Sequence, residues 1–240
     1  MTASIPQIGF DRLVRLEWAD MAMRVRAGTA SSGELSALLD VAELGPAARK
    51  KTRTLLNRLW LEPHPVLQGL ADRAVSLRAR YPGTLPTIFC WGMAISAYPF
   101  FGQVAENIGR LSALHGDCTT AEIHRRMRER FGERETIKRV TNWVIQTQVD
   151  WVVIRHGSTR KQVLRQAPIQ LGSNEVAAWL VEAAVRYAGK ALPVATLMSM
   201  PALFPFVAPG QFAYLLSSIP TLDVHDQGSG QQFVSVRETA

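Results

Sequence analysis

Cysteine is scarce in this sequence: Cys90 and Cys118 are the only two among 240 residues. The first segment, MTASIPQIGFDRLVRLEW, also lacks the long apolar run of a secretory signal, because Asp11 introduces charge early. Two cysteines and no export signal fit a reducing compartment. We therefore expect a cytoplasmic protein.

Sequence motifs of common enzymes are missing as well. The chain contains no Walker phosphate-binding loop, no glycine-rich dinucleotide turn, no Gly-x-Ser-x-Gly elbow and no His-Glu-x-x-His pair. Asp223, His225 and Asp226 come nearest to an acid–base cluster, but they lie on or beside a predicted hairpin turn, where Asp is common. We therefore predict neither catalytic activity nor a bound cofactor.

Metal-ligating residues are also sparse. His115, Cys118 and His124 are the best candidates for a zinc site, which usually needs four ligands in paired spacings. We find no fourth ligand, and we expect His124 on the exposed side of its helix. Because His115 and Cys118 are also typical of a helix terminus, the sequence predicts no metal site.

Charged residues are absent from Tyr81 to Ala105, in the segment YPGTLPTIFCWGMAISAYPFFGQVA. This length would suffice to span a bilayer. Prolines and glycines interrupt the segment, however, and polar Thr87, Ser96 and Tyr98 lie within its apolar core. We therefore predict a buried helix and no contact with a membrane. The other uncharged stretch, 191–222, holds five prolines and is a poorer candidate.

Basic residues outnumber acidic ones by 27 to 20, which gives a formal net charge of +7. Residues 1–115 hold 13 basic and 9 acidic side chains, and the shorter segment 116–170 holds 11 and 6. Residues 171–240 hold 3 and 5. A positive balance favours nucleic acid or another anionic surface as the partner, and we expect the first two regions to contact it.

The order of predicted elements indicates a mainly α-helical protein of three units. We interpret residues 1–83 as a helical helix-turn-helix region, 84–170 as a basic winged-helix-like domain and 171–240 as a second winged-helix-like domain. Each of the last two units ends in a predicted β-hairpin. The expected fold class is therefore a tandem array of helix-turn-helix and winged-helix units with small β-hairpin wings.

The middle unit shows the clearest pattern. Apolar residues recur with helical spacing before and after Gly132, first at Ile123, Met127 and Phe131, then at Ile137, Val140, Thr141 and Val144. After Asp150 the pattern changes to WVVIR, a turn and QVLRQA, which predicts two strands. In a winged helix, the helix before these strands enters the major groove of DNA.

Basic side chains are expected on the outer faces of two helices, 46–61 and 133–148, each the second helix of a predicted helix-turn-helix, and in the hairpin turn that follows the latter. Arg and Lys contact phosphate or guanine, and Asn can pair with adenine. A solvated helix neutralised by glutamates such as Glu129, Glu133 and Glu135 is the competing interpretation. The candidate DNA contacts are Arg49, Lys50, Lys51, Arg53, Arg134, Lys138, Arg139, Asn142, Arg160 and Lys161.

The third unit differs from the second in charge. Its predicted third helix, PGQFAYLLSSIP, carries no charged residue. Phe212, Tyr214, Leu215 and Leu216 suit packing better than a DNA groove. We therefore predict that residues 171–240 dock another protein.

Three segments resemble a known family. SALLDVAELGPAARKKTRTLLNRLWL, IFCWGMAISAYPFFGQVAENI and ETIKRVTNWVIQTQVDWVVI are similar in order and pattern to segments of BrxA proteins, from bacteriophage exclusion (BREX) defence systems. The resemblance covers residues 34–236 by element order, and 45–60 and 131–154 by residue pattern. It implies a helical, DNA-binding accessory protein without catalytic activity, with contacts from the basic helices at 49–58 and 134–142.

These observations predict a non-catalytic accessory protein that binds double-stranded DNA, in a prokaryotic antiviral defence system of the BREX kind. Other proteins of such a system would dock on residues 171–240. The alternatives are a protein-interaction scaffold, whose basic faces only solubilise it, and a transcriptional regulator with winged-helix docking modules.

Overall fold

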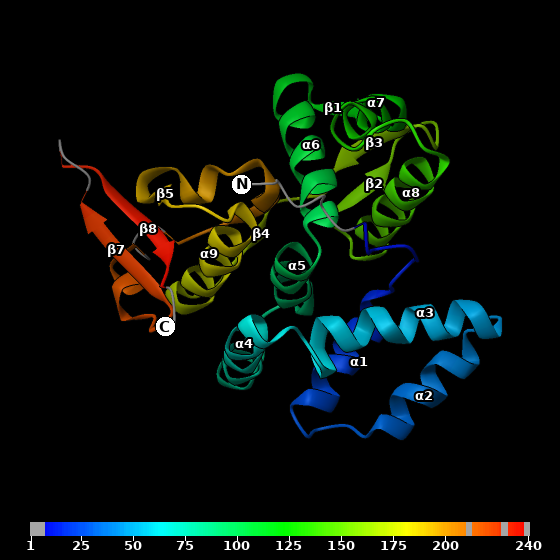
Figure 1. Ribbon diagram of the computed structural model, residues 1–240, viewed down its shortest axis with the longest axis horizontal. Helices are drawn as coiled ribbons and strands as arrows, with labels where there is room; N and C mark the ends of the chain where they lie inside the picture. The colour runs from blue at the N-terminus through cyan, green and yellow to red at the C-terminus, as the bar shows by residue number, and fades with distance from the viewer. Residues whose placement is uncertain (1–7, 210–212, 227–229, 238–240) are drawn as a thin grey trace.

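The computed structural model describes residues 8–209, 213–226 and 230–237, which are mainly helical and carry three small sheets (Figure 1). The N-terminal region contains α1 (Leu16–Arg26), α2 (Ser32–Val41), α3 (Pro46–Leu56) and α4 (Gln68–Arg80). Helix α2 begins at a capping box, in which Ser31 and Glu34 bond to each other's backbone amides. Helix α3 begins with Pro46 and runs directly into a π-helical turn, Asn57–Leu61.

Helix α5 (Pro86–Ala97) is buried along nearly its whole length, which confirms the prediction from its uncharged sequence. It lies at the centre of the molecule in Figure 1, between α1, α6 (Pro99–His115) and α9 (Asn174–Ala188). Trp91 of α5 packs edge-on against Phe101, Phe204 and Phe206. The central helix therefore joins all three predicted units through one apolar cluster.

Among the described residues, no single helix is both long and apolar enough to cross a membrane. Helices α5 and α6 meet that test only as a pair, and the chain bends by 116° between them.

The middle unit runs from α6 through β1 (Asp117–Thr119), α7 (Thr120–Phe131), α8 (Glu135–Asp150), β2 (Ile154–His156) and β3 (Gln162–Arg165). Its antiparallel sheet has the order β1-β3-β2, so the last strand lies in the middle. The short strand β1 was not expected from the sequence. Ile123 and Met127 of α7 are buried, and so is the predicted apolar face of α8.

The third unit follows β4 (Ile169–Gln170) and begins with α9. Its sheet has the order β5-β8-β7, formed by β5 (Leu192–Pro193), β7 (Leu222–Asp226) and β8 (Gln232–Val236). The sheet order and its place in the chain therefore repeat those of the middle unit. A separate parallel pair joins β4 to β6 (Phe206–Val207).

The prediction of two further α-helices after α9 in the third unit is wrong. The chain instead forms the 3₁₀ helices η3 (Val194–Ser199), η4 (Pro201–Leu203) and η5 (Ala213–Ser218). Pro201 and Pro205 lack the N–H groups that a continuing α-helix needs. Phe212 and the turn residues Gly228 and Ser229 lie outside the described residues.

Candidate nucleic-acid interface

The turn between α7 and α8 sets the orientation of α8, the helix predicted to enter the major groove. Helix α7 starts at a capping box of Thr119 and Glu122 and ends at Gly132, whose φ of 85° suits glycine. Arg134 occupies the N-cap of α8 and makes no side-chain capping bond. Ile137 and Val140 are fully buried and hold the first half of α8 against the core.

The opposite face of α8 is open to solvent. Arg134, Lys138 and Arg139 are all exposed, and each lies outside the apolar stripe. In the part of the chain that the structure describes, none of the three has a carboxylate within 4.0 Å. The predicted outward position of these three residues is therefore what the structure has.

The β2–β3 hairpin adds further cations. Arg155, Arg160 and Lys161 are exposed and, among the described residues, also lack ion-pair partners. The turn itself is fixed, because the backbone carbonyl of Lys161 accepts a hydrogen bond from Thr120 N–H at 2.8 Å. Gln162 also donates to Asp117 and accepts from Ser158 N–H at 3.2 Å. These bonds tie the hairpin to the start of α7.

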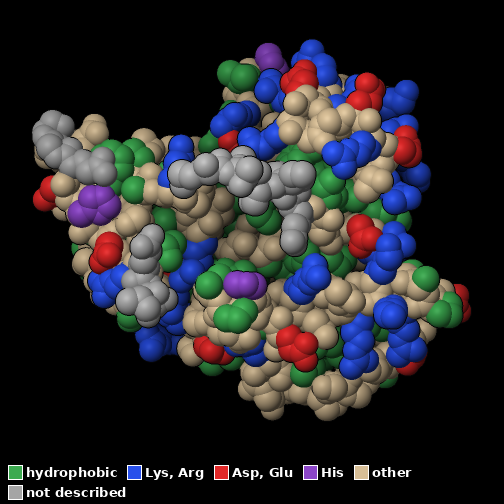
Figure 2. All heavy atoms as spheres, in the orientation of Figure 1, with side chains coloured by type: hydrophobic (Ala, Val, Ile, Leu, Met, Phe, Trp, Pro, Cys, Tyr) green, Lys and Arg blue, Asp and Glu red, His purple; other side chains and the backbone are tan. Residues whose placement is uncertain are grey.

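Glutamates pair with two of the four arginines of α7, whereas among the described residues they pair with none of Arg134, Lys138 and Arg139 on α8. Arg128 pairs with Glu133 at 2.8 Å, and Arg125 with Glu129 at 3.9 Å. Figure 2 shows Lys and Arg side chains gathered over the α7–α8 lobe and again over α3, with acidic side chains between some of them. The solvated-helix interpretation therefore describes α7 better than α8.

Asn142 lies less exposed than its predicted place on the outer face of α8. It is half-buried, and its Oδ1 lies 2.9 Å from Nε2 of His124 on α7. His124 is half-buried as well, so its expected exposed position is wrong. The two helices cross so that these side chains meet between them, and the Asn142 carboxamide is already engaged within the protein.

The environment of His124 disfavours its charged form. Burial is the main cause of its lowered pKa, and the nearby cations Lys138 and Arg128 lower it further. The hydrogen bond to Asn142 and the charge of Glu135 act in the opposite direction. A neutral imidazole is therefore favoured directly beneath the basic face of α8.

The basic side chains of α3 are largely occupied by the protein itself. Arg49 pairs with Asp40, Lys51 pairs with Asp11 at 2.7 Å, and Arg53 donates to Ser36 Oγ at 3.1 Å. Lys50 is exposed and is the one predicted α3 contact without such a partner among the described residues. Sequence spacing could not show the pairing of Lys51 with Asp11, because Asp11 comes from a distant segment of the chain.

The other candidate clusters have structural partners. Asp223 pairs with Arg237 at 2.9 Å, and the His225 ring stacks on Phe233. Cys118 is buried in the sheet, and burial raises the pKa of its thiol to about 12. Within the described ranges, no group of three or more His, Cys, Asp or Glu residues is placed to hold a metal ion.

Comparisons of this chain with family models, with curated proteins and with solved structures found no match.

Proposed function

We propose that this protein binds double-stranded DNA through residues 99–165, acting as a winged-helix unit without catalytic activity. A helix, a strand, two helices and two strands, with the last strand central in the sheet, are typical of such units. In this arrangement α8 lies in the major groove, and the β2–β3 hairpin contacts the backbone.

The observation that carries the proposal is a set of six exposed cations on α8 and the hairpin that have no carboxylate partner in the part of the chain that the structure describes. Phosphate contacts supply most of the affinity of non-specific DNA binding, and Lys and Arg make them without regard to sequence. Because the Asn142 carboxamide already faces His124, α8 offers cations rather than an adenine-reading side chain. We therefore propose binding mainly through the DNA backbone, with weak sequence preference.

Helix α3 is the second proposed contact. Lys50 can meet phosphate directly, whereas Arg49, Lys51 and Arg53 would first have to exchange their partners within the protein. Breaking each exposed pair costs only about 0–1 kcal/mol, but Asp40 and Asp11 remain beside α3 and reduce the positive charge that this helix presents to phosphate. We therefore expect α3 to strengthen binding less than α8 does.

The resemblance to BrxA proteins supports a further proposal, that the protein is an accessory component of a prokaryotic phage-defence system. Its third unit would then dock another component. The side chain of Tyr214 on η5 is 65% exposed, although we expected this residue to pack. That exposed ring favours the docking role, and a pure interaction scaffold is the alternative function.

The test measures duplex binding by fluorescence anisotropy across a series of salt concentrations. Replacing Lys138→Ala together with Arg139→Ala should weaken binding and reduce the slope of log K against log salt by about two. The matched control is Arg125→Ala with Arg128→Ala, which removes the same charge from α7, where glutamates already pair with it. The control should change the slope much less.

Other results would point elsewhere. Absence of binding by the wild-type protein at micromolar concentration and low salt would favour the scaffold. A wild-type slope and affinity in the variant with Lys138→Ala and Arg139→Ala would show that these α8 side chains make no phosphate contacts. A preferred site recovered by selection from random duplexes would favour a transcriptional regulator.

A further inference from the structure

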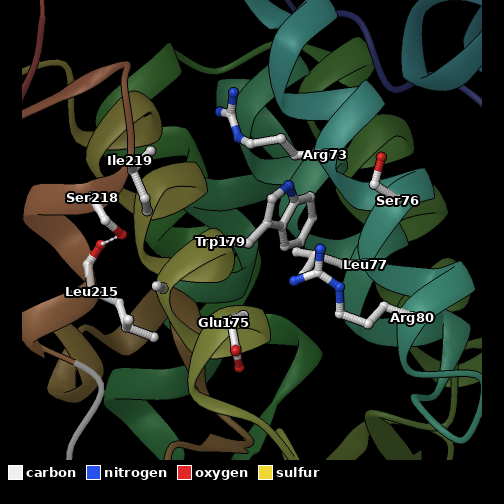
Figure 3. A pocket seen from close by; sticks show the side chains of 10 residues that line it. Arg73, Ser76, Leu77, Arg80, Glu175, Trp179, Leu215, Ser218 and Ile219 are labelled. Atoms are coloured by element: carbon white, nitrogen blue, oxygen red, sulfur yellow. Dashed lines mark hydrogen bonds between the residues drawn. The ribbon is translucent and has the colours of Figure 1, made fainter.

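A small open cavity of about 220 Å³ lies between α4, α9 and η5. Figure 3 shows side chains of α4 on one side, α9 in the middle and η5 on the other. None of the residues proposed to contact DNA lines this cavity. The lining is mostly apolar, with arginines on α4 and one glutamate on α9.

The floor of the cavity is held rigidly. Trp179 is only 2% exposed, and its indole N–H donates to the Leu70 carbonyl at 2.9 Å. Phe89 packs edge-on against the ring, and a Cβ at Gly92 would lie 2.5 Å from ring carbons, so the indole has no room to shift that way. The walls, by contrast, are partly open to solvent, through Leu77, Leu215 and Ile219. A preformed apolar cavity of this kind is typical of ligand sites.

Arg73 brings unsatisfied positive charge to the cavity. Its Nη2 contacts Glu182, which has no exposed surface, but Arg186 also bonds the same carboxylate at 2.8 Å. Two guanidinium groups therefore share one buried negative charge. The Nε–H of Arg73 is buried and has no hydrogen-bond acceptor among the described residues. Because that atom is buried, a ligand in the cavity cannot reach it, and Arg73 favours an anion there only through its charge.

Arg80 supplies a second cation, on the opposite side of the Trp179 indole from Arg73. It is exposed and, in the described ranges, has no ion-pair partner. In Figure 3 Arg80 extends from α4 toward Trp179 and the cavity, whereas the Arg73 guanidinium lies beyond the indole and turns away from Arg80, where it meets Glu182. The carboxylate of Glu175 points away from Arg73, toward the opposite end.

We propose that this cavity binds a small apolar monocarboxylate, with a body about the size of one ring or one branched chain. An apolar cavity of about 150 Å³ holds benzene, whereas drug-sized ligands need about 300–1,000 Å³. The apolar body would contact Leu77, Leu215 and Ile219. Its carboxylate would accept hydrogen bonds from the guanidinium of Arg80, a planar donor that suits this planar anion.

The experiment titrates the full-length protein with four probes, using isothermal calorimetry and ligand-observed NMR. Benzoate and isocaproate have both the apolar body and the charge, whereas benzamide lacks the charge and acetate lacks the body. The first two should bind at least about tenfold more tightly than the last two, because a charge-assisted hydrogen bond contributes at least that factor.

Two variants place the binding in this cavity. Arg80→Met should weaken benzoate binding at least about tenfold, while Arg78→Met should leave it unchanged. Arg78 is on the same helix, but it faces Asp20 at 3.9 Å and does not line this cavity. Ser218→Trp changes an exposed residue of the rim and should block binding without altering the unfolding midpoint.

Three results would each overturn the proposal. The first is the absence of any saturable binding by benzoate or isocaproate. The second is benzamide binding as tightly as benzoate, which would remove the role of the arginines. The third is wild-type affinity in both Arg80→Met and Ser218→Trp, which would place the ligand elsewhere. Because no probe is a nucleic acid, these results are independent of the DNA proposal.

Discussion

At the scale of single residues, the contact between His124 and Asn142 gives the folded protein a defined response to acid. The pKa of His124 is lower in the folded chain than its ordinary value of 6.5, so the unfolded chain binds the proton more readily. The free energy of unfolding should therefore fall as the pH drops below about 6.5, and level off below the folded-state pKa. Urea unfolding followed between pH 7.5 and 5 measures this change.

The control for this prediction is His64→Gln, because His64 is exposed and close to none of these groups. His124→Gln should remove part of the loss of stability at acid pH, whereas His64→Gln should not. A pH profile that is the same in wild type and His124→Gln would mean that His124 has the same pKa in the folded and unfolded chains, and would contradict the prediction.

Val152 is strained at the residue scale as well. It follows α8 with a φ of 58°, and a β-branched side chain disfavours this left-handed region. The side chain is also 58% exposed, so little packing is lost on its removal. Val152→Gly should therefore raise the free energy of unfolding by about 0.5–1 kcal/mol, after the greater chain entropy of glycine is included.

Chemical denaturation of Val152→Gly, compared with Val152→Ala, checks the cause. Alanine removes the same branched side chain but keeps the Cβ, so it should recover less stability than glycine. A lower stability of the glycine variant than of wild type would contradict the prediction, and would mean that the contacts of the Val152 side chain outweigh the backbone strain.

At the scale of elements, the approach of η4 to α6 depends on one glycine. A Cβ at Gly109 would lie 2.0 Å from the backbone carbonyl oxygen of Pro201, and backbone cannot rotate away as a side chain can. Gly109→Ala should therefore destabilise the protein by about 1–3 kcal/mol. Gly33→Ala in α2 is the control, since its Cβ would meet only Ser31 Oγ at 3.6 Å.

Thermal unfolding of the two alanine variants separates packing from helix propensity. Alanine is the better helix former at both positions, so Gly33→Ala should be neutral or slightly stabilising. If Gly109→Ala did not lower the unfolding midpoint, the prediction would be contradicted, because η4 would have to shift away from α6 at little cost in free energy.

The elements that the sequence predicts well are those with a long apolar period. Ile137, Val140 and Val144 define α8 because each lies on one face of a regular helix, and that face finds the core regardless of which partner covers it. The position of Asn142 depends instead on the angle at which α7 crosses α8, which periodicity does not contain. The same reason hides the pairing of Lys51 with Asp11.

The third unit was harder to predict for a different physical reason. Its segments after α9 are short and contain prolines, so local propensity and tertiary packing have comparable weight there. The arrangement of β5, β7 and β8 in one sheet was accessible only in part, since the β7–β8 hairpin has a clear sequence pattern and the two-residue strand β5 has none.

At the scale of the whole molecule, Glu182 connects three distant parts of the chain. Its buried carboxylate accepts hydrogen bonds from Arg73 on α4, from Arg186 on α9, and from Thr221 before β7 at 2.7 Å. Glu182→Gln would leave two guanidinium groups without a counter-charge. It should lower the free energy of unfolding by about 3–5 kcal/mol, as removal of one member of a buried ion pair does.

The comparison is Asp72→Asn, which weakens the ion pair to Arg26 at the surface, where the Asp72 side chain is 66% exposed. This variant should lose less than about 1 kcal/mol. Equilibrium denaturation in guanidinium chloride measures both. A small effect of Glu182→Gln would show that the two arginines find other acceptors, and that the network is not needed to join the units.

The central position of α5 has a consequence for synthesis on the ribosome. Helix α5 ends at Ala97, and α9, whose Trp179 packs on Phe89 of α5, begins only at Asn174. At about 5–20 residues per second, a nascent chain carries this apolar helix without its cover for on the order of 4–15 seconds. The greatest exposure to aggregation therefore falls before the chain is complete, when the finished fold cannot yet shield the helix.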